Sequence, residues 1–168
     1  MQTTTIINDV IRMSKAARRL GRAMQSVAGG PVHDACGLTP KELILLRAVE
    51  AGSAFPHEIS DRTDTAAPLV TRVADRLVEL GYVERQPDTV DRRRVALVVT
   101  EAGAQAGADG WSAMREVLAH VFGDVPAGTI ARLAADMEAL SDAVEAKDLA
   151  AQAGTAPEDG GGRQGASA

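Results

Sequence analysis

Apolar residues recur every three or four positions along most of the chain, which is the spacing of amphipathic helices. This pattern predicts six helices, over residues 5–28, 40–51, 57–63, 66–80, 101–122 and 127–149. Between the fourth and the fifth helix, residues 82–86 and a β-branched run at 95–100 predict two short strands, joined by a polar turn. The expected fold class is therefore mainly α with a small β-hairpin (α+β).

Glycine and proline positions predict where the first helices begin and end. Thr39 followed by Pro40 fits the start of the second helix, with threonine as the cap and proline in the first turn. Gly81 suits a left-handed cap after the fourth helix. Gly29, Gly30 and Pro31 are expected to end the first helix, so that residues 33–37 form a loop.

The order helix, helix, short helix, turn, helix, hairpin, helix, helix is that of a winged helix-turn-helix flanked by additional helices. The expected division is an N-terminal dimerisation helix and loop (1–37), a winged helix-turn-helix DNA-binding region (38–100), C-terminal dimerisation helices (101–149) and a disordered tail (150–168). The tail has no large apolar side chain to offset its ordering entropy. The long terminal helices have more apolar surface than a winged helix can cover, which favours a two-fold homodimer; packing within one chain is the alternative.

Composition changes this picture in three respects. No stretch approaches the roughly 20 apolar residues of a membrane span, so a soluble cytoplasmic protein without membrane contact is expected. The single cysteine excludes an internal disulfide and a four-cysteine zinc site. The net charge of −5 argues little against a nucleic-acid partner, because residues 101–168 hold 11 acidic and only 4 basic side chains.

The helix over residues 66–80 has two different faces, as a DNA recognition helix requires. Its inward stripe consists of Val70, Val73, Ala74, Leu77 and Leu80, and the remaining surface carries Pro68, Leu69, Thr71, Arg72 and Arg76. Arg72 and Arg76 are one helical turn apart and can reach neighbouring phosphates or bases. Because Asp75 and Glu79 lie among them, a merely solvated charged face is the alternative.

The tip of the predicted hairpin carries Asp91 followed by three arginines, Arg92, Arg93 and Arg94. Adjacent guanidinium groups repel one another, so such a cluster favours a site where phosphates or the negative minor groove of DNA compensate the charge. Asp91 is the natural brace for one of the guanidinium groups. An exposed, solvated turn is the alternative.

Residues 38–104, which begin LTPKELILLRAV and continue through TRVADRLVELGYVERQPDTVDRRRVALVVTEAG, resemble the MarR family of bacterial transcriptional regulators. The resemblance implies a two-fold dimer in which the outer helices form the interface. It also implies that paired recognition helices and wings bind double-stranded DNA at palindromic operators, usually as a repressor. By position, Thr71 and Arg72 would lie in the major groove, and Arg93, held by Asp91, would reach the minor groove. Arg76, Arg92 and Arg94 would contact phosphates.

The recognition helix departs from the family pattern at its start. Residues 66–69 are Ala, Ala, Pro and Leu, where the family often has serine and threonine. Fewer direct base hydrogen bonds are therefore expected. Specificity would come more from thymine-methyl contacts and groove shape.

The resemblance further implies modulation by a small ligand, typically anionic or phenolic. Five basic residues of the first helix, Arg12, Lys15, Arg18, Arg19 and Arg22, are candidates to pair with an anion; a plain basic surface is the alternative. No resident cofactor is expected. The sequence contains no phosphate loop, glycine fingerprint, HExxH or nucleophile–base pair, so an enzyme is not expected.

Two other functions remain as alternatives. Cys36 lies near His33 and Asp34, and a zinc- or thiol-responsive site would form if His57, His120 or Asp124 completed the set of ligands. A winged helix can also serve protein assembly without binding DNA. A DNA-binding regulator and a protein-assembly module can be distinguished by the effect of salt, because the affinity for DNA falls steeply as the salt concentration rises.

Overall fold

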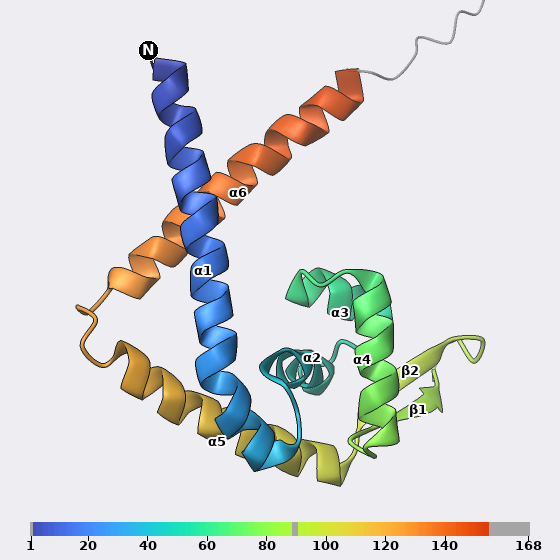
Figure 1. Cartoon of the computed structure of the whole chain (residues 1–168). Helices are drawn as coiled ribbons and strands as arrows, with labels where there is room; N and C mark the ends of the chain where they lie inside the picture. Colours follow the sequence, from blue (N-terminus) through green and yellow to red (C-terminus); the bar gives the residue numbers. More distant parts are fainter. Residues whose placement is uncertain (1, 89–90, 155–168) are drawn as a thin grey trace, which may run out of the picture. The chain divides into compact units, whose positions relative to one another are not determined.

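The computed structural model describes residues 2–88 and 91–154. Its elements are α1 (Gln2–Cys36), α2 (Pro40–Glu50), α3 (Pro56–Thr63), α4 (Ala67–Glu79), β1 (Val83–Pro87), β2 (Val95–Val99), α5 (Glu101–Phe122) and α6 (Thr129–Gly154) (Figure 1). The chain divides into two compact units, Met1–Gly123 and Asp124–Ala168. The predicted fold class, mainly helical with one antiparallel hairpin, is confirmed.

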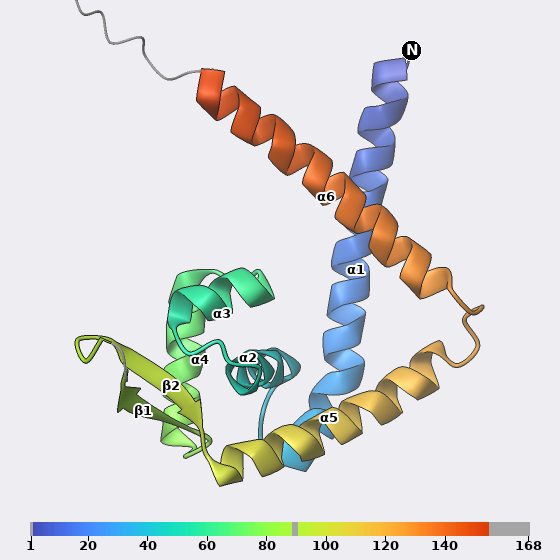
Figure 2. The ribbon, with the colours of Figure 1, turned by 180° about the vertical axis from the view of Figure 1, so that it is seen from behind.

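The core of the first unit surrounds α2, which lies among α1, α3, α4 and α5 (Figure 2). Five of its 11 residues are buried, Leu43, Leu45, Leu46, Ala48 and Val49. They lie around the helix rather than on one stripe, which confirms that α2 is buried on more than one side. Thr39 accepts a hydrogen bond from the Glu42 backbone N–H, and the Glu42 carboxylate accepts one from Thr39, which forms a capping box at the start of the helix.

The hairpin pairs β1 with β2 in antiparallel register, with Val83 opposite Val99 and Pro87 opposite Val95. Val83 and Leu97 are buried in the core, and Val99 is partly buried and packs against it. The Leu97 backbone N–H also donates to the Ala54 carbonyl at 2.8 Å, so the loop before α3 is attached to the free edge of β2. The wing is therefore connected to the helix-turn-helix at its base.

The first helix does not end at Gly29–Pro31, as the local sequence predicts, but continues to Cys36. Ala28, Val32 and Cys36 are buried, and Gly110 of α5 leaves room for the Cys36 sulfur. This packing outweighs the low helix propensity of two glycines and a proline. The helix ends at Gly37, whose φ of 71° places it in the left-handed region. The expected loop over residues 33–37 was therefore wrong.

The second unit contains α6, which follows the left-handed Gly128 and extends to Gly154. The sequence predicts its end near residue 149 and disorder from residue 150; the helix instead continues through residues 150–154. Alanine-rich sequence, which lacks apolar bulk, still has high helix propensity. The rest of the predicted tail, residues 155–168, lies outside the described residues. Within the described part of the chain, no helix combines the length and the apolar character needed to cross a bilayer.

Candidate nucleic-acid interface

Helix α4 has the two faces that the sequence predicts. Val70, Val73, Ala74 and Leu77 are buried, and the predicted inward residue Leu80 lies half-buried at the C-cap. On the opposite face, Pro68, Thr71, Arg72 and Arg76 are exposed, and Leu69 is half-buried. The N-cap Ala66 makes no side-chain capping bond, so the first turn of α4 presents backbone and apolar groups.

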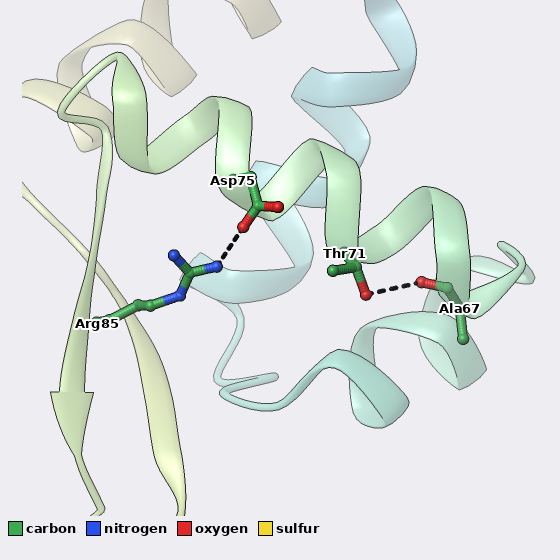
Figure 3. A network of polar contacts seen from close by, with 4 residues as sticks. All are labelled: Ala67, Thr71, Asp75 and Arg85. Carbon is green, nitrogen blue, oxygen red and sulfur yellow. Dashed lines mark hydrogen bonds and ion pairs between the residues drawn. The ribbon is translucent and has the colours of Figure 1, made fainter.

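The charged residues of α4 are not equivalent. Asp75 forms an ion pair with Arg85 of β1 (Figure 3), and Arg76 lies 3.7 Å from the Glu79 carboxylate. Arg72 makes no ion pair within residues 2–88 and 91–154. Because both acidic neighbours already have a cation beside them, Arg72 remains available to an external anion.

Arg85 was not among the candidate residues of the sequence. The sequence feature that could have identified it is the two-residue period of a strand. Arg85 lies on the same strand face as the buried Val83, so its side chain points back toward α4. The ion pair with Asp75 connects the wing to the recognition helix across ten positions of sequence.

Thr71 turns its hydroxyl toward its own helix. The Oγ1 atom donates to the Ala67 carbonyl at 3.1 Å, as Figure 3 shows. With its proton engaged in this way, the side chain offers a methyl group and an acceptor oxygen to a ligand rather than a donor.

A groove of about 620 Å³ runs between α4 and the start of α2. Lys41 of α2 lines it together with Leu69 and Arg72 of α4. Glu42, which also lines the groove, is engaged in the capping box, and Lys41 is exposed with no ion pair among the described residues. Sequence reasoning missed Lys41, because only the fold brings the start of α2 beside α4.

The turn of the wing is closed by Asp91 through the backbone. Its carboxylate accepts from the Arg93 N–H at 3.0 Å, and its carbonyl accepts from the Arg94 N–H at 2.8 Å. In the described residues, Asp91 forms no ion pair with an arginine. Asp91 therefore does brace the tip, but by holding the turn and not a guanidinium group.

The three wing arginines have different surroundings. Arg92 and Arg93 are exposed at the turn. Arg94, expected to contact phosphate, has its guanidinium carbon 3.6 Å from the centre of the Phe55 ring, at the start of α3. The wing thus presents two arginines outward and holds the third against the helix-turn-helix.

The structure does not bring the zinc and thiol candidates together. His33, His57 and His120 are exposed, and the described residues contain no group of three or more His, Cys, Asp or Glu side chains that could hold a metal ion. Cys36 is buried and donates to the Val32 carbonyl at 3.2 Å. Burial raises the pKa of the Cys36 thiol, which disfavours the reactive thiolate.

Residues 37–94 match the model of the MarR family. Among curated proteins, the chain is 35% identical over 68 residues to the HTH-type transcriptional repressor MdtR of Bacillus subtilis, covering 40% of this chain and 44% of that protein. It is 40% identical over 65 residues to the uncharacterized HTH-type transcriptional regulator YcgE of the same species, covering 38% and 42%. The chain thus spans less than half of the length of these relatives.

Solved structures of regulators share the fold over a larger part of the chain. The regulator BldR from Sulfolobus solfataricus superposes with a TM-score of 0.71 at 19% identity, covering 81% of this chain and 97% of that one. A mutant MarR from E. coli complexed with operator DNA superposes with a TM-score of 0.70 at 19% identity, covering 79% of this chain and 96% of that one. CouR from Rhodococcus jostii RHA1, bound to p-coumaroyl-CoA, superposes with a TM-score of 0.67 at 16% identity, covering 76% of this chain and 90% of that one.

Proposed function

Because the chain belongs to the MarR family of helix-turn-helix regulators, we propose that it represses transcription as a homodimer bound to a palindromic operator. Helix α4 enters the major groove, and the wing reaches over the backbone into the minor groove. The observation that carries the proposal is the distribution of charge: Arg72, Arg92 and Arg93 are exposed on one winged helix, while Asp75 is paired with Arg85. The similar MarR from E. coli has been crystallised with operator DNA.

The residues of α4, α2 and the wing that face outward have separate roles in this proposal. Arg72 contacts bases or phosphates in the major groove, while Pro68, Leu69 and the Thr71 methyl meet thymine methyl groups. Arg93 enters the minor groove, and Arg92 and Lys41 contact phosphates on either side of the recognition helix. Arg76 contributes less to DNA affinity, because the Glu79 carboxylate, 3.7 Å away, partly compensates its charge.

The homodimer is supported by apolar side chains that one copy leaves exposed. On α1 they are Ile6, Ile7, Val10, Ile11, Met13 and Leu20, and on α6 they are Ile130, Leu133, Met137, Leu140 and Val144, all at least 40% exposed. Apolar rows of this length are unusual on the surface of a monomer. A two-fold partner would cover them and would supply the second recognition helix that a palindrome requires.

The salt dependence of duplex binding tests the proposal. Fluorescence anisotropy with labelled duplex is expected to give an affinity that falls with a log–log slope of about −0.9 for each neutralised phosphate. For six to ten contacts per dimer, the loss between 50 and 200 mM salt would be roughly 10³- to 10⁵-fold. A protein that binds no duplex at low salt would contradict the proposal and would favour a winged helix used only for protein assembly.

We also propose that a small anionic or phenolic ligand modulates DNA binding, as the coumaroyl-CoA complex of CouR suggests by analogy. The five basic residues of α1 line neither of two large grooves. A groove of about 650 Å³ between α1 and α5 contains Asp34 and Glu116, which would repel an anion. A groove of about 870 Å³ between α2 and α5 contains Arg115, the ring of Trp111 and the Arg47–Glu50 ion pair. Because Glu50 already compensates Arg47, Arg115 and the Trp111 ring are the groups that fit an aromatic anion.

Thermal unfolding with added hydroxycinnamic and hydroxybenzoic acids tests the ligand site. A ligand at 100 times its Kd is expected to stabilise the protein by about 2.7 kcal/mol, and Arg115→Ala is expected to abolish most of that gain. Arg132→Ala on α6 removes the same charge outside the groove and serves as the control. An undiminished ligand response of the Arg115→Ala variant would exclude this groove as the site.

A further inference from the structure

We infer that Phe55 is a positioning residue for the wing: its ring holds Arg94 and thereby fixes the turn that presents Arg92 and Arg93. The inference rests on the proposed function for its effect on DNA, but its geometry stands independently of DNA. Arg94 then acts mainly on the conformation of the wing and not as a DNA contact. Phe55, an uncharged residue outside α4 and the wing, affects how DNA is read.

The contact between the two side chains is close and specific. The Arg94 guanidinium carbon lies 3.6 Å from the centre of the Phe55 ring, well inside the distance of about 6 Å at which a cation is attracted to an aromatic face. Both residues are near the surface: Arg94 is exposed and Phe55 is half-buried. A guanidinium is weakly hydrated and planar, so it stacks on a ring with little loss of solvation.

Phe55 is itself a fixed platform. Its backbone N–H and that of Ala54 both donate to Glu58 Oε2, at 3.2 and 2.8 Å. Its carbonyl accepts from the Ile59 N–H at 3.1 Å in the first turn of α3, and Ile59 is buried in the core. The His57 ring stacks against the Phe55 ring, with 6.0 Å between centroids and 17° between planes. The backbone of Phe55 is therefore held by the first turn of α3, and its ring lies against His57.

Arg94 in turn is the residue through which the tip is attached. Its N–H donates to the Asp91 carbonyl at 2.8 Å, and its carbonyl accepts from the Asp88 N–H at 2.9 Å. Arg92 and Arg93 lie inside the turn that these two bonds close. Toward the base of the wing, Leu97 bonds Ala54 and Arg85 pairs with Asp75. Of these three contacts, the one between Phe55 and Arg94 lies nearest to the tip, so its loss frees the turn while the base stays attached.

Amide hydrogen exchange followed by NMR on the DNA-free protein tests the geometric part. Phe55→Leu keeps apolar bulk and removes the ring, and it is expected to speed exchange of the Arg94 and Asp88 amides about 2- to 5-fold. Phe55→Tyr keeps the ring and is expected to retain the wild-type rates. Unchanged rates in Phe55→Leu, or accelerated rates in Phe55→Tyr, would overturn the inference. Because a leucine could disturb α3, Arg94→Gln is measured as well, and the double variant is expected to exchange no faster than either single variant.

The DNA part is measured as base preference at each operator position. Phe55→Leu is expected to lose A·T preference at the flanking positions under the wing, with unchanged preferences under α4, and Phe55→Tyr is expected to restore it. If Arg94 were only a phosphate contact, Phe55→Leu would leave every preference unchanged, which would contradict the positioning role. If instead the proposed function were wrong, the wild-type protein would bind no duplex, while the exchange rates of the DNA-free variants would remain as expected.

Discussion

Arg93→Ala is expected to weaken operator binding by about 1–3 kcal/mol, roughly 5- to 150-fold in Kd, with no change in the free energy of unfolding. Within the described residues, the Arg93 side chain makes no hydrogen bond or ion pair, and it is exposed. Its only contribution to the turn is the backbone N–H that Asp91 accepts, and alanine retains that group. The loss of affinity therefore reports on DNA contact alone.

The measurement is a duplex titration at constant salt, together with urea unfolding of both proteins. Arg132→Ala on α6 serves as the matched control, since it removes the same charge outside the winged helix. If the two variants lost the same small amount of affinity, the wing would contribute only general charge. If Arg93→Ala bound like the wild type, the wing would have no role in DNA binding.

Gly103→Ala is expected to destabilise the first unit by about 3 kcal/mol, the upper end of the usual cost of overpacking. A Cβ at this position would lie 1.9 Å from the Tyr82 carbonyl oxygen and 2.7 Å from its carbon, which are backbone atoms. They cannot swing aside as a side chain would, because the same oxygen accepts a hydrogen bond from the Thr100 N–H at 3.0 Å. The start of α5 thus requires a residue without a side chain, because the backbone of Tyr82, just before β1, lies against it.

Thermal and urea unfolding measure this effect, with an expected fall in Tm of about 6–12 °C for a chain of this size. Gly29→Ala is the matched control: a Cβ there meets nothing within 4 Å, the position lies beyond the exposed apolar row of α1, and alanine favours the helix by roughly 0.5–1 kcal/mol. Unfolding free energies of Gly103→Ala and wild type that agree within about 0.5 kcal/mol would show that the close approach is not present in solution.

Most of the winged helix-turn-helix could be predicted because each element carries a local signal. Thr39 with Glu42 caps α2, Gly81 follows α4, and a β-branched run forms β2, so the expected boundaries lie within one or two residues of the observed ones. The failure at α1 has the opposite cause. Its glycine and proline signal is local, but the burial of Val32 and Cys36 against α5 is tertiary and decides the outcome.

The candidate site shows the same division between local and tertiary information. Exposed cations such as Arg72 and Arg93 could be identified from helical spacing and from their place in the hairpin. Their partners could not, because the fold brings Asp75 to Arg85, and Phe55 to Arg94 from 39 positions away in the sequence. Pairing between distant side chains, and not the presence of charge, decides which arginines remain available to an external anion.

The central claim, that this chain reads duplex DNA as a symmetric pair, is tested most directly by selection of bound duplexes from a random-sequence pool with the wild-type protein. The account predicts enrichment of a palindrome whose half-sites lie about 10–10.5 base pairs apart, or a multiple of that spacing. A pool that remains unenriched after repeated rounds at low salt, or that yields only unpaired half-sites, would contradict it.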